Sequence, residues 1–136
     1  MKLLINTDGG ARGNPGPAGI GAIVKYEKKE EKILKYIGEA TNNQAEYRAV
    51  IEALKWVKGN IRESDIVIEC LLDSELIVEQ LNQRYKLKNE GLKPLFWEIR
   101  DLIMALGGQV SFKYIPREQN KEADKLVNQA IDKRSK

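Results

Sequence analysis

The stretch that decides the fold is Lys2-Leu3-Leu4-Ile5-Asn6-Thr7-Asp8-Gly9-Gly10. Its apolar run ends in one acid and two glycines, which predicts a buried strand that delivers the carboxylate of Asp8 to a sheet edge. Three later acids, Glu46, Asp73 and Asp124, fall where other predicted elements begin or just inside them. We therefore expect the four carboxylates to form one metal-binding cluster around Asp8.

The composition indicates a single globular domain. The chain has 136 residues, of which 42% are apolar and 32% charged, enough to build one core over residues 1–136. No apolar run approaches the roughly 20 residues that span a bilayer, so no membrane association is expected. The single cysteine, Cys70, cannot form an internal disulfide and is typical of a reducing compartment. We expect a cytoplasmic, monomeric protein.

The absence of histidine limits the chemistry. It excludes the imidazole base of serine and cysteine hydrolase triads and removes the usual nitrogen ligand of zinc. A catalytic metal would have to be held by oxygen, which suits Mg²⁺ or Mn²⁺. The net charge of +3 is too small to indicate nucleic-acid binding by itself.

The order of the predicted strands and helices is that of an α/β protein. A turn-rich loop is predicted for residues 9–17, and alternating strands for 18–26 and 32–40, separated by the charged residues 27–31. Apolar residues recur with helical spacing in residues 45–57, 74–82, 95–106 and 123–131. Two more strands are expected at residues 66–72 and 110–115. This order predicts a mixed five-stranded sheet with helices on both faces. The first and fourth strands should be parallel neighbours, joined by a right-handed crossover that carries Glu46 over the sheet.

Taken singly, two of the acids have ordinary structural explanations. Glu46 lies near a helix start, where the helix dipole favours an acid, and Asp73 could simply cap the following helix. Together, however, four crowded carboxylates would repel each other unless divalent cations neutralised them. Two such ions can activate a water molecule and stabilise the leaving oxygen of a phosphodiester without any histidine. Phosphodiester hydrolysis is the predicted reaction class.

Five motifs together cover nearly the whole chain: Thr7-Asp8-Gly9-Gly10, Gly13-Asn14-Pro15-Gly16-Pro17-Ala18-Gly19, Thr41-Asn42-Asn43-Gln44-Ala45-Glu46-Tyr47, Asp73-Ser74 and Arg117-Glu118-Gln119-Asn120-Lys121-Glu122-Ala123-Asp124. They resemble the motifs of type 1 ribonuclease H and occur in the order of that family. The resemblance implies the ribonuclease H-like fold. It also implies endonucleolytic cleavage of the RNA strand of RNA/DNA hybrids, leaving 5′-phosphate and 3′-hydroxyl ends, with two Mg²⁺ or Mn²⁺ ions.

The resemblance also assigns roles to residues. Asp8 would bridge both ions, Asp124 would help hold the ion that activates water, and Glu46 with Asp73 would hold the ion beside the leaving group. Glu46 would also meet an RNA 2′-hydroxyl. The expected substrate contacts are Asn14, Asn42 and Asn43, the backbone of Gly10, Ala11 and Arg12, and Thr41 on a DNA phosphate. These contacts recognise the shape of the hybrid, so little sequence preference is expected.

The chain departs from the family pattern in two places. Arg117 and Glu118 occupy a short loop where many members carry a histidine that assists product release, and an auxiliary role is expected for them. This pattern resembles the archaeal-like branch. The basic segment at residues 84–93 is short and no hybrid-binding domain is expected, which predicts weak, salt-sensitive substrate affinity.

Two alternatives remain open from sequence. A nuclease of the same fold could act on another duplex, such as double-stranded RNA or branched DNA. The domain could instead be a non-catalytic module that binds hybrids, although four retained carboxylates argue against this because phosphate binding gains nothing from them.

Overall fold

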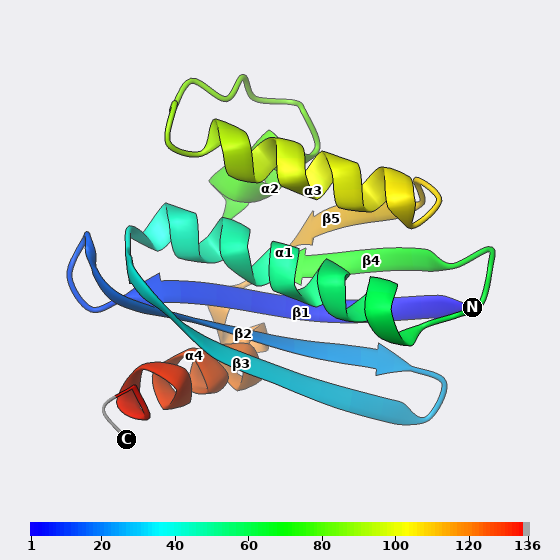
Figure 1. Ribbon diagram of the computed structural model, residues 1–136, viewed down its shortest axis with the longest axis horizontal. Helices are drawn as coiled ribbons and strands as arrows, with labels where there is room; N and C mark the ends of the chain where they lie inside the picture. Colours follow the sequence, from blue (N-terminus) through cyan, green and yellow to red (C-terminus); the bar gives the residue numbers. More distant parts are fainter. Residues whose placement is uncertain (135–136) are drawn as a thin grey trace.

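The computed structural model describes residues 1–134, which form one sheet and four α-helices (Figure 1). The strands are β1 (Lys2–Ala11), β2 (Gly16–Tyr26), β3 (Lys29–Ala40), β4 (Val67–Leu72) and β5 (Val110–Tyr114). The helices are α1 (Asn42–Asn60), α2 (Glu75–Leu81), α3 (Lys93–Ala105) and α4 (Lys121–Asp132), with a short 3₁₀ turn, η1, at Arg117–Gln119. None of these helices is both long and apolar enough to cross a bilayer.

The sheet has the predicted mixed topology, with strand order β3-β2-β1-β4-β5. The first three strands form an antiparallel meander, and β4 lies parallel to β1, with Ile5 opposite Cys70. Strand β5 extends the sheet in parallel beyond β4. The carboxyl ends of β1 and β4 therefore reach the same edge of the sheet, which is the arrangement that the crossover through α1 predicts.

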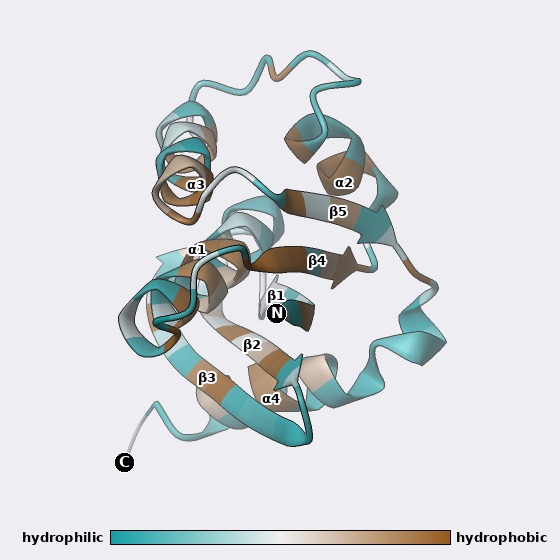
Figure 2. Cartoon of the chain, turned by 90° about the vertical axis from the view of Figure 1, so that its right-hand side faces the viewer, coloured by the Kyte–Doolittle hydropathy of each residue, from teal (hydrophilic) through white to brown (hydrophobic). Residues whose placement is uncertain are grey.

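Helices cover both faces of the sheet (Figure 2). On one face, α1 packs on β1 and β2 and contacts α3; on the other, α4 packs on β2 and β3. The larger core lies between the sheet and the α1–α3 layer, where Leu3, Ile5 and Leu54 are fully buried. A smaller cluster of Ile23, Ala123 and Leu126 lies between the sheet and α4. Strand β4 is hydrophobic along most of its length in Figure 2, as expected for an inner strand.

Two glycines of β2 allow α4 to approach the sheet closely. A Cβ atom at Gly21 would lie 2.5 Å from the carbonyl oxygen of Ala123, and one at Gly19 would lie 3.0 Å from that of Val127. Neither distance leaves room for a side chain. These glycines therefore fix the height of α4, and with it the position of Asp124, above the sheet.

The predicted loops at residues 9–17 and 27–31 were too long. Strand β1 continues to Ala11 and β2 begins at Gly16, since Gly9 and Gly10 pair with Ile20 and Gly19 in the ladder. The second connection is a turn at residues 27–28, and the charged residues 29–31 belong to β3. Their side chains are exposed on an edge strand, where charge is compatible with strand structure and discourages pairing with other chains.

Candidate active site

Strands β1 and β4 bring Asp8 and Asp73 to one edge of the sheet. Asp8 lies near the end of β1 and is only 7% exposed, and Asp73 follows the last residue of β4 and is half-buried. Ligand sites of α/β sheets collect at such carboxyl ends. The alternative role of Asp73 was to cap the helix that follows it. The residue that caps α2 is instead Ser74, whose hydroxyl accepts from the Ile77 N–H.

Glu46 enters from the first turns of α1, which begins at a capping box. The Thr41 hydroxyl accepts from the Gln44 N–H, and the Gln44 side chain accepts from the Thr41 N–H. This helix end can approach β1 because residue 9 is glycine: a Cβ there would lie 2.6 Å from the Glu46 nitrogen. The Gly9 N–H in turn donates to Glu46 Oε1 at 2.7 Å. The sheet therefore holds one oxygen of Glu46 directly.

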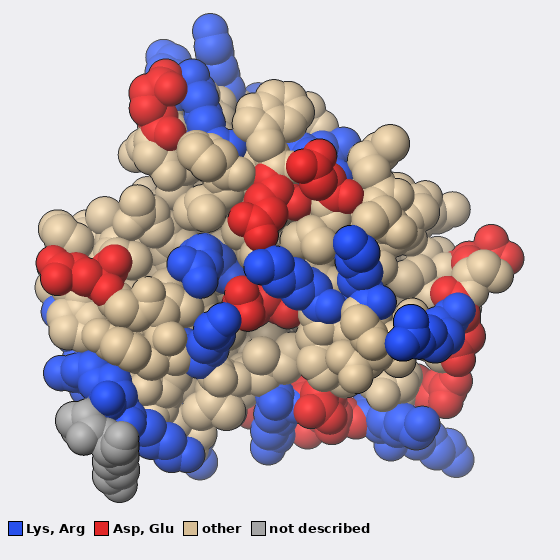
Figure 3. Space-filling view, in the orientation of Figure 1, with Lys and Arg blue, Asp and Glu red and all other residues tan. Residues whose placement is uncertain are grey.

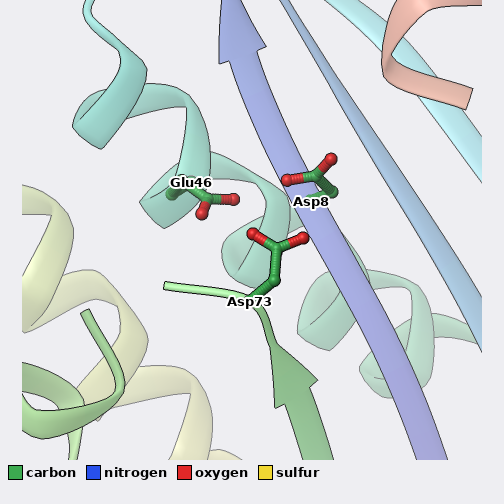
Figure 4. A group of neighbouring side chains, drawn as sticks. All are labelled: Asp8, Glu46 and Asp73. Carbon is green, nitrogen blue, oxygen red and sulfur yellow. The ribbon is translucent and has the colours of Figure 1, made fainter. Parts of the chain in front are cut away.

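The three carboxylates of Asp8, Glu46 and Asp73 converge (Figure 4). Each offers an oxygen atom, and these oxygens lie within 4.8 Å of one another. Burial and the neighbouring charge of Asp73 raise the pKa of Asp8 to about 7. Burial and the charge of Asp8 likewise raise the pKa of Glu46 well above its usual value. Such mutual repulsion is costly in a site that no cation neutralises.

Asp124 faces the same cleft from α4 but stands outside the tight group of three. The cleft has a volume of about 460 Å³. The negative charge of Asp124 adds to the repulsion that raises the pKa of Asp8. Arg117 also lines this cleft, whereas the exposed Glu118 in the same turn does not. The full lining is Asp8, Gly9, Gly10, Asn42, Asn43, Glu46, Asp73, Ser74, Arg117 and Asp124.

The expected substrate-binding residues divide into two groups. Gly10, Asn42 and Asn43 line the cleft. The others surround its rim: the Ala11 N–H donates to Asn42 Oδ1, and the Asn42 N–H donates to Asn14 Oδ1.

Two of the rim residues also have structural roles. The hydroxyl of Thr41 caps α1. The Arg12 side chain turns to α4, where it pairs with Asp132 at 2.6 Å and donates to Asn128, so the backbone of this residue is what remains for a substrate.

Sequence reasoning missed the buried amides behind the site. Asn120, at the start of α4, is 1% exposed and donates to Thr7 O and to Asp73 Oδ2 at 2.8 and 2.9 Å. Asn6 donates to Asn120 Oδ1 at 3.1 Å. Asn120 was visible only as part of the last motif, where an asparagine before a helix suggests nothing beyond a cap.

The donor set fits a hard divalent cation. Within residues 1–134, none of the four carboxylates is paired with a lysine or arginine. All the clustered donors are carboxylate oxygens, the ligands that Mg²⁺ and Mn²⁺ prefer. A divalent cation held by Asp8, Glu46 and Asp73 would offset the repulsion that raises the pKa values of Asp8 and Glu46.

Comparisons with known proteins agree with this geometry. The reverse transcriptase-like family matches residues 6–130. A bifunctional protein of Mycobacterium tuberculosis is 40% identical over 97% of the chain, but the chain spans only 36% of that protein. A protein of Ruthia magnifica named ribonuclease H is 32% identical, and 97% of each chain is covered.

Solved structures resemble the chain closely over its whole length. LC11-RNase H1, isolated from compost by a metagenomic approach, superposes with a TM-score of 0.93 at 47% identity and 99% coverage of both chains. The same protein in complex with an RNA/DNA hybrid gives a TM-score of 0.92 at 45% identity, covering 98% of this chain and 99% of that one. The shared strand order, the convergent acids and these matches together show that the chain belongs to the type 1 ribonuclease H family.

Proposed function

We propose that this chain is an endonuclease that hydrolyses the RNA strand of RNA/DNA hybrids with the help of two divalent metal ions. The observation that carries the proposal is the convergence of Asp8, Glu46 and Asp73 in a polar cleft that Asp124 also lines. A similar protein has been solved with an RNA/DNA hybrid bound. A non-catalytic module would have no use for buried, mutually repelling carboxylates.

The four carboxylates would hold Mg²⁺ or Mn²⁺. When bound, such ions activate water and stabilise the charge that develops on a phosphodiester. The protein supplies the geometry: β1 and β4 fix two of the acids, and the Gly9 N–H fixes Glu46 Oε1. Arg117, which lines the cleft, would place a positive charge near the phosphates, and an auxiliary role is proposed for it. Glu118 does not line the cleft.

Recognition of the hybrid is proposed to be largely independent of sequence. Since the Asn42 N–H is a donor, the atom of Asn14 that faces it must be Oδ1, which leaves the Asn14 NH₂ group to donate outward. Every base pair offers an acceptor in its minor groove. A donor at this rim position can therefore be satisfied by any sequence.

Weak overall affinity is consistent with the charges on the surface. Figure 3 shows acidic and basic side chains interspersed over the α1–α3 face. Within the basic segment at residues 84–93, Arg84 is paired with Glu79 and Lys93 with Glu90. This leaves Lys86 and Lys88 as the cations of the segment without an acidic partner among the described residues. The monomeric state and the cytoplasmic location remain predictions.

The test is cleavage of a labelled RNA strand in an RNA/DNA hybrid, with matched RNA/RNA and DNA/DNA duplexes, in Mg²⁺, Mn²⁺ or EDTA. The variants are Asp8→Asn and, as a matched control, Asp101→Asn on the exposed side of α3. We expect metal-dependent cleavage of the hybrid, abolished by Asp8→Asn and unchanged in the control. A folded wild-type protein that binds the hybrid and leaves it intact would refute the enzymatic function. Cleavage of RNA/RNA would extend the substrate range.

A further inference from the structure

The side chain of Asn120 is a buried polar group that touches the site without being one of its acids. It lies four residues before Asp124, at the start of α4, and is 1% exposed. Its NH₂ group donates to the carbonyl oxygen of Thr7 at 2.8 Å and to Asp73 Oδ2 at 2.9 Å. Its Oδ1 accepts from the amide of Asn6 at 3.1 Å. The carboxamide therefore uses both its donor group and its acceptor.

The partners determine which way this amide points. A backbone carbonyl and a carboxylate are both acceptors, so only the NH₂ group of Asn120 can face them. Its oxygen must then face Asn6, which in turn must present its own NH₂ group. Hydrogen-bond donation thus runs in one direction, from Asn6 on β1 through Asn120 at the start of α4 to Asp73, which follows β4. It connects three segments that are far apart in sequence.

Asp73 needs such a partner because the other two acids of the cluster repel it. Glu46 is held against this repulsion by the Gly9 N–H. Asp73 is less buried and follows the end of its strand, where the ladder no longer fixes it. Within the described part of the chain, Asn120 is the only side chain that donates a hydrogen bond to Asp73.

We propose that Asn120 is a positioning residue of the nuclease site: oriented by Asn6, its carboxamide fixes the rotation of the Asp73 carboxylate and docks the turn that leads to Asp124. The proposal rests on the metal-dependent cleavage proposed above. It predicts that residue 120 affects how the acids bind a divalent cation, not how the protein binds its nucleic-acid substrate. Partners that orient a metal ligand are typically worth 10- to 100-fold in metal affinity or activity.

The test compares Asn120→Ala with Asn6→Ala and a control, Asn82→Ala. Asn82 also donates a partly buried amide hydrogen bond, to the carbonyl oxygen of Phe112, but it lies outside the cleft. Three quantities are measured for each variant: Mg²⁺ and Mn²⁺ affinity by calorimetry without substrate, kcat and KM for the hybrid against Mg²⁺ concentration, and Tm. All activities are measured at a temperature at which circular dichroism shows each variant to be folded.

For Asn120→Ala we expect metal affinity to fall by roughly 10- to 100-fold and kcat to fall at fixed Mg²⁺, with KM for the hybrid within about twofold of wild type. Asn6→Ala should shift metal affinity in the same direction but less, because Asn120 keeps its own donor contacts. Asn82→Ala should lower Tm and leave metal affinity unchanged. Should Asn120→Ala fail to fold, the comparison of Asn6→Ala with Asn82→Ala still decides the question.

A folded Asn120→Ala protein with wild-type metal affinity and kcat, whatever its Tm, would overturn the proposal and leave Asn120 a purely structural residue. If Asn120→Ala does not fold, the proposal is overturned when Asn6→Ala and Asn82→Ala prove indistinguishable in metal affinity. A wild type that binds cations but cleaves no hybrid would refute the proposed function, while calorimetry would still judge Asn120. A wild type that binds no divalent cation would refute both.

Discussion

Replacing Gly9 with alanine should disrupt the site without touching any of its acids. The added Cβ would lie 2.6 Å from the Glu46 nitrogen and still closer to the carbonyl group of Ala45. Both neighbours are backbone atoms, so no side-chain rotation can relieve the contact. Gly9 does not have a positive φ angle, and alanine can adopt its backbone conformation. The effect of the substitution is therefore purely steric.

The size of the expected effect follows from the distance of 2.6 Å between the added Cβ and the Glu46 nitrogen. Ordinary contacts of a Cβ are about 1 Å longer, so the first turn of α1 must move away from β1 by roughly that amount. This movement would stretch the bond between the Gly9 N–H and Glu46 Oε1, now 2.7 Å, and carry Glu46 away from Asp8. A displacement of about 1 Å in a catalytic group costs on the order of 100-fold in rate. Overpacking of this kind costs about 1–3 kcal/mol of stability, or roughly 3–12 °C in Tm for a domain of this size.

The assay is hybrid cleavage at saturating Mg²⁺ below the Tm of every variant, with Gly59→Ala as the control. Gly59 lies in the same helix, and a Cβ there meets no atom within 4 Å. That control should retain full activity and gain up to about 1 kcal/mol, because alanine favours helix. If a folded Gly9→Ala protein cleaved the hybrid at the wild-type rate, the claim that residue 9 sets the position of Glu46 would be wrong.

Four further predictions concern pH, a buried hydroxyl, the cysteine and salt. Without metal, the pKa of Asp8 rises from 3.8 to about 7 on folding, so the stability that protonated Asp8 contributes is complete below pH 3.8 and lost as pH rises to about 7. Tm should fall over that range and recover with Mg²⁺; a flat Tm would contradict this. Thr7→Val should leave the free energy of unfolding unchanged or raise it by about 1 kcal/mol, because the buried Thr7 hydroxyl has no hydrogen-bond partner within residues 1–134; a clear loss in chemical denaturation would reveal a hidden partner. Burial raises the pKa of Cys70 to about 12, so a thiol reagent should modify it only in denaturant, and rapid labelling of native protein would refute this. Hybrid affinity should fall with salt with a log–log slope of roughly −2 to −4; insensitivity to salt would contradict the phosphate contacts.

The sequence predicted the sheet well because its signals are local and strong. The apolar run ending at Asp8 and the buried run ending before Asp73 are β1 and β4, and the expected parallel pairing is confirmed. The alternation that defined residues 18–26 and 32–40 is also confirmed. Strand ends were harder to place. Gly9 and Gly10 suggest a turn by composition, yet ladder pairing with β2 keeps them extended, an outcome of tertiary contacts.

The acids could be predicted, but their supporting atoms could not. Repulsion among Asp8, Glu46 and Asp73 follows from residue type once topology brings them together. The Gly9 N–H donates a hydrogen bond to Glu46, and the Asn120 amide donates one to Asp73. Both bonds join segments that are distant in sequence at less than 3 Å, and no local sequence pattern encodes such a contact. The orientation of Arg12 toward Asp132 is of the same kind, since a basic residue in a predicted binding loop gives no sign of it.

The bond between Asn6 and Asn120 spans 114 residues, and Asp124 stands just beyond it. Closing a loop of this length costs entropy that is recovered only when α4 reaches the sheet. Secondary structure and collapse around the α1–α3 core can precede that step. In a refolding experiment, the recovery of hybrid cleavage would therefore report when α4 docks on the sheet. Far-ultraviolet circular dichroism does not isolate this event, because its signal comes from all the helices together.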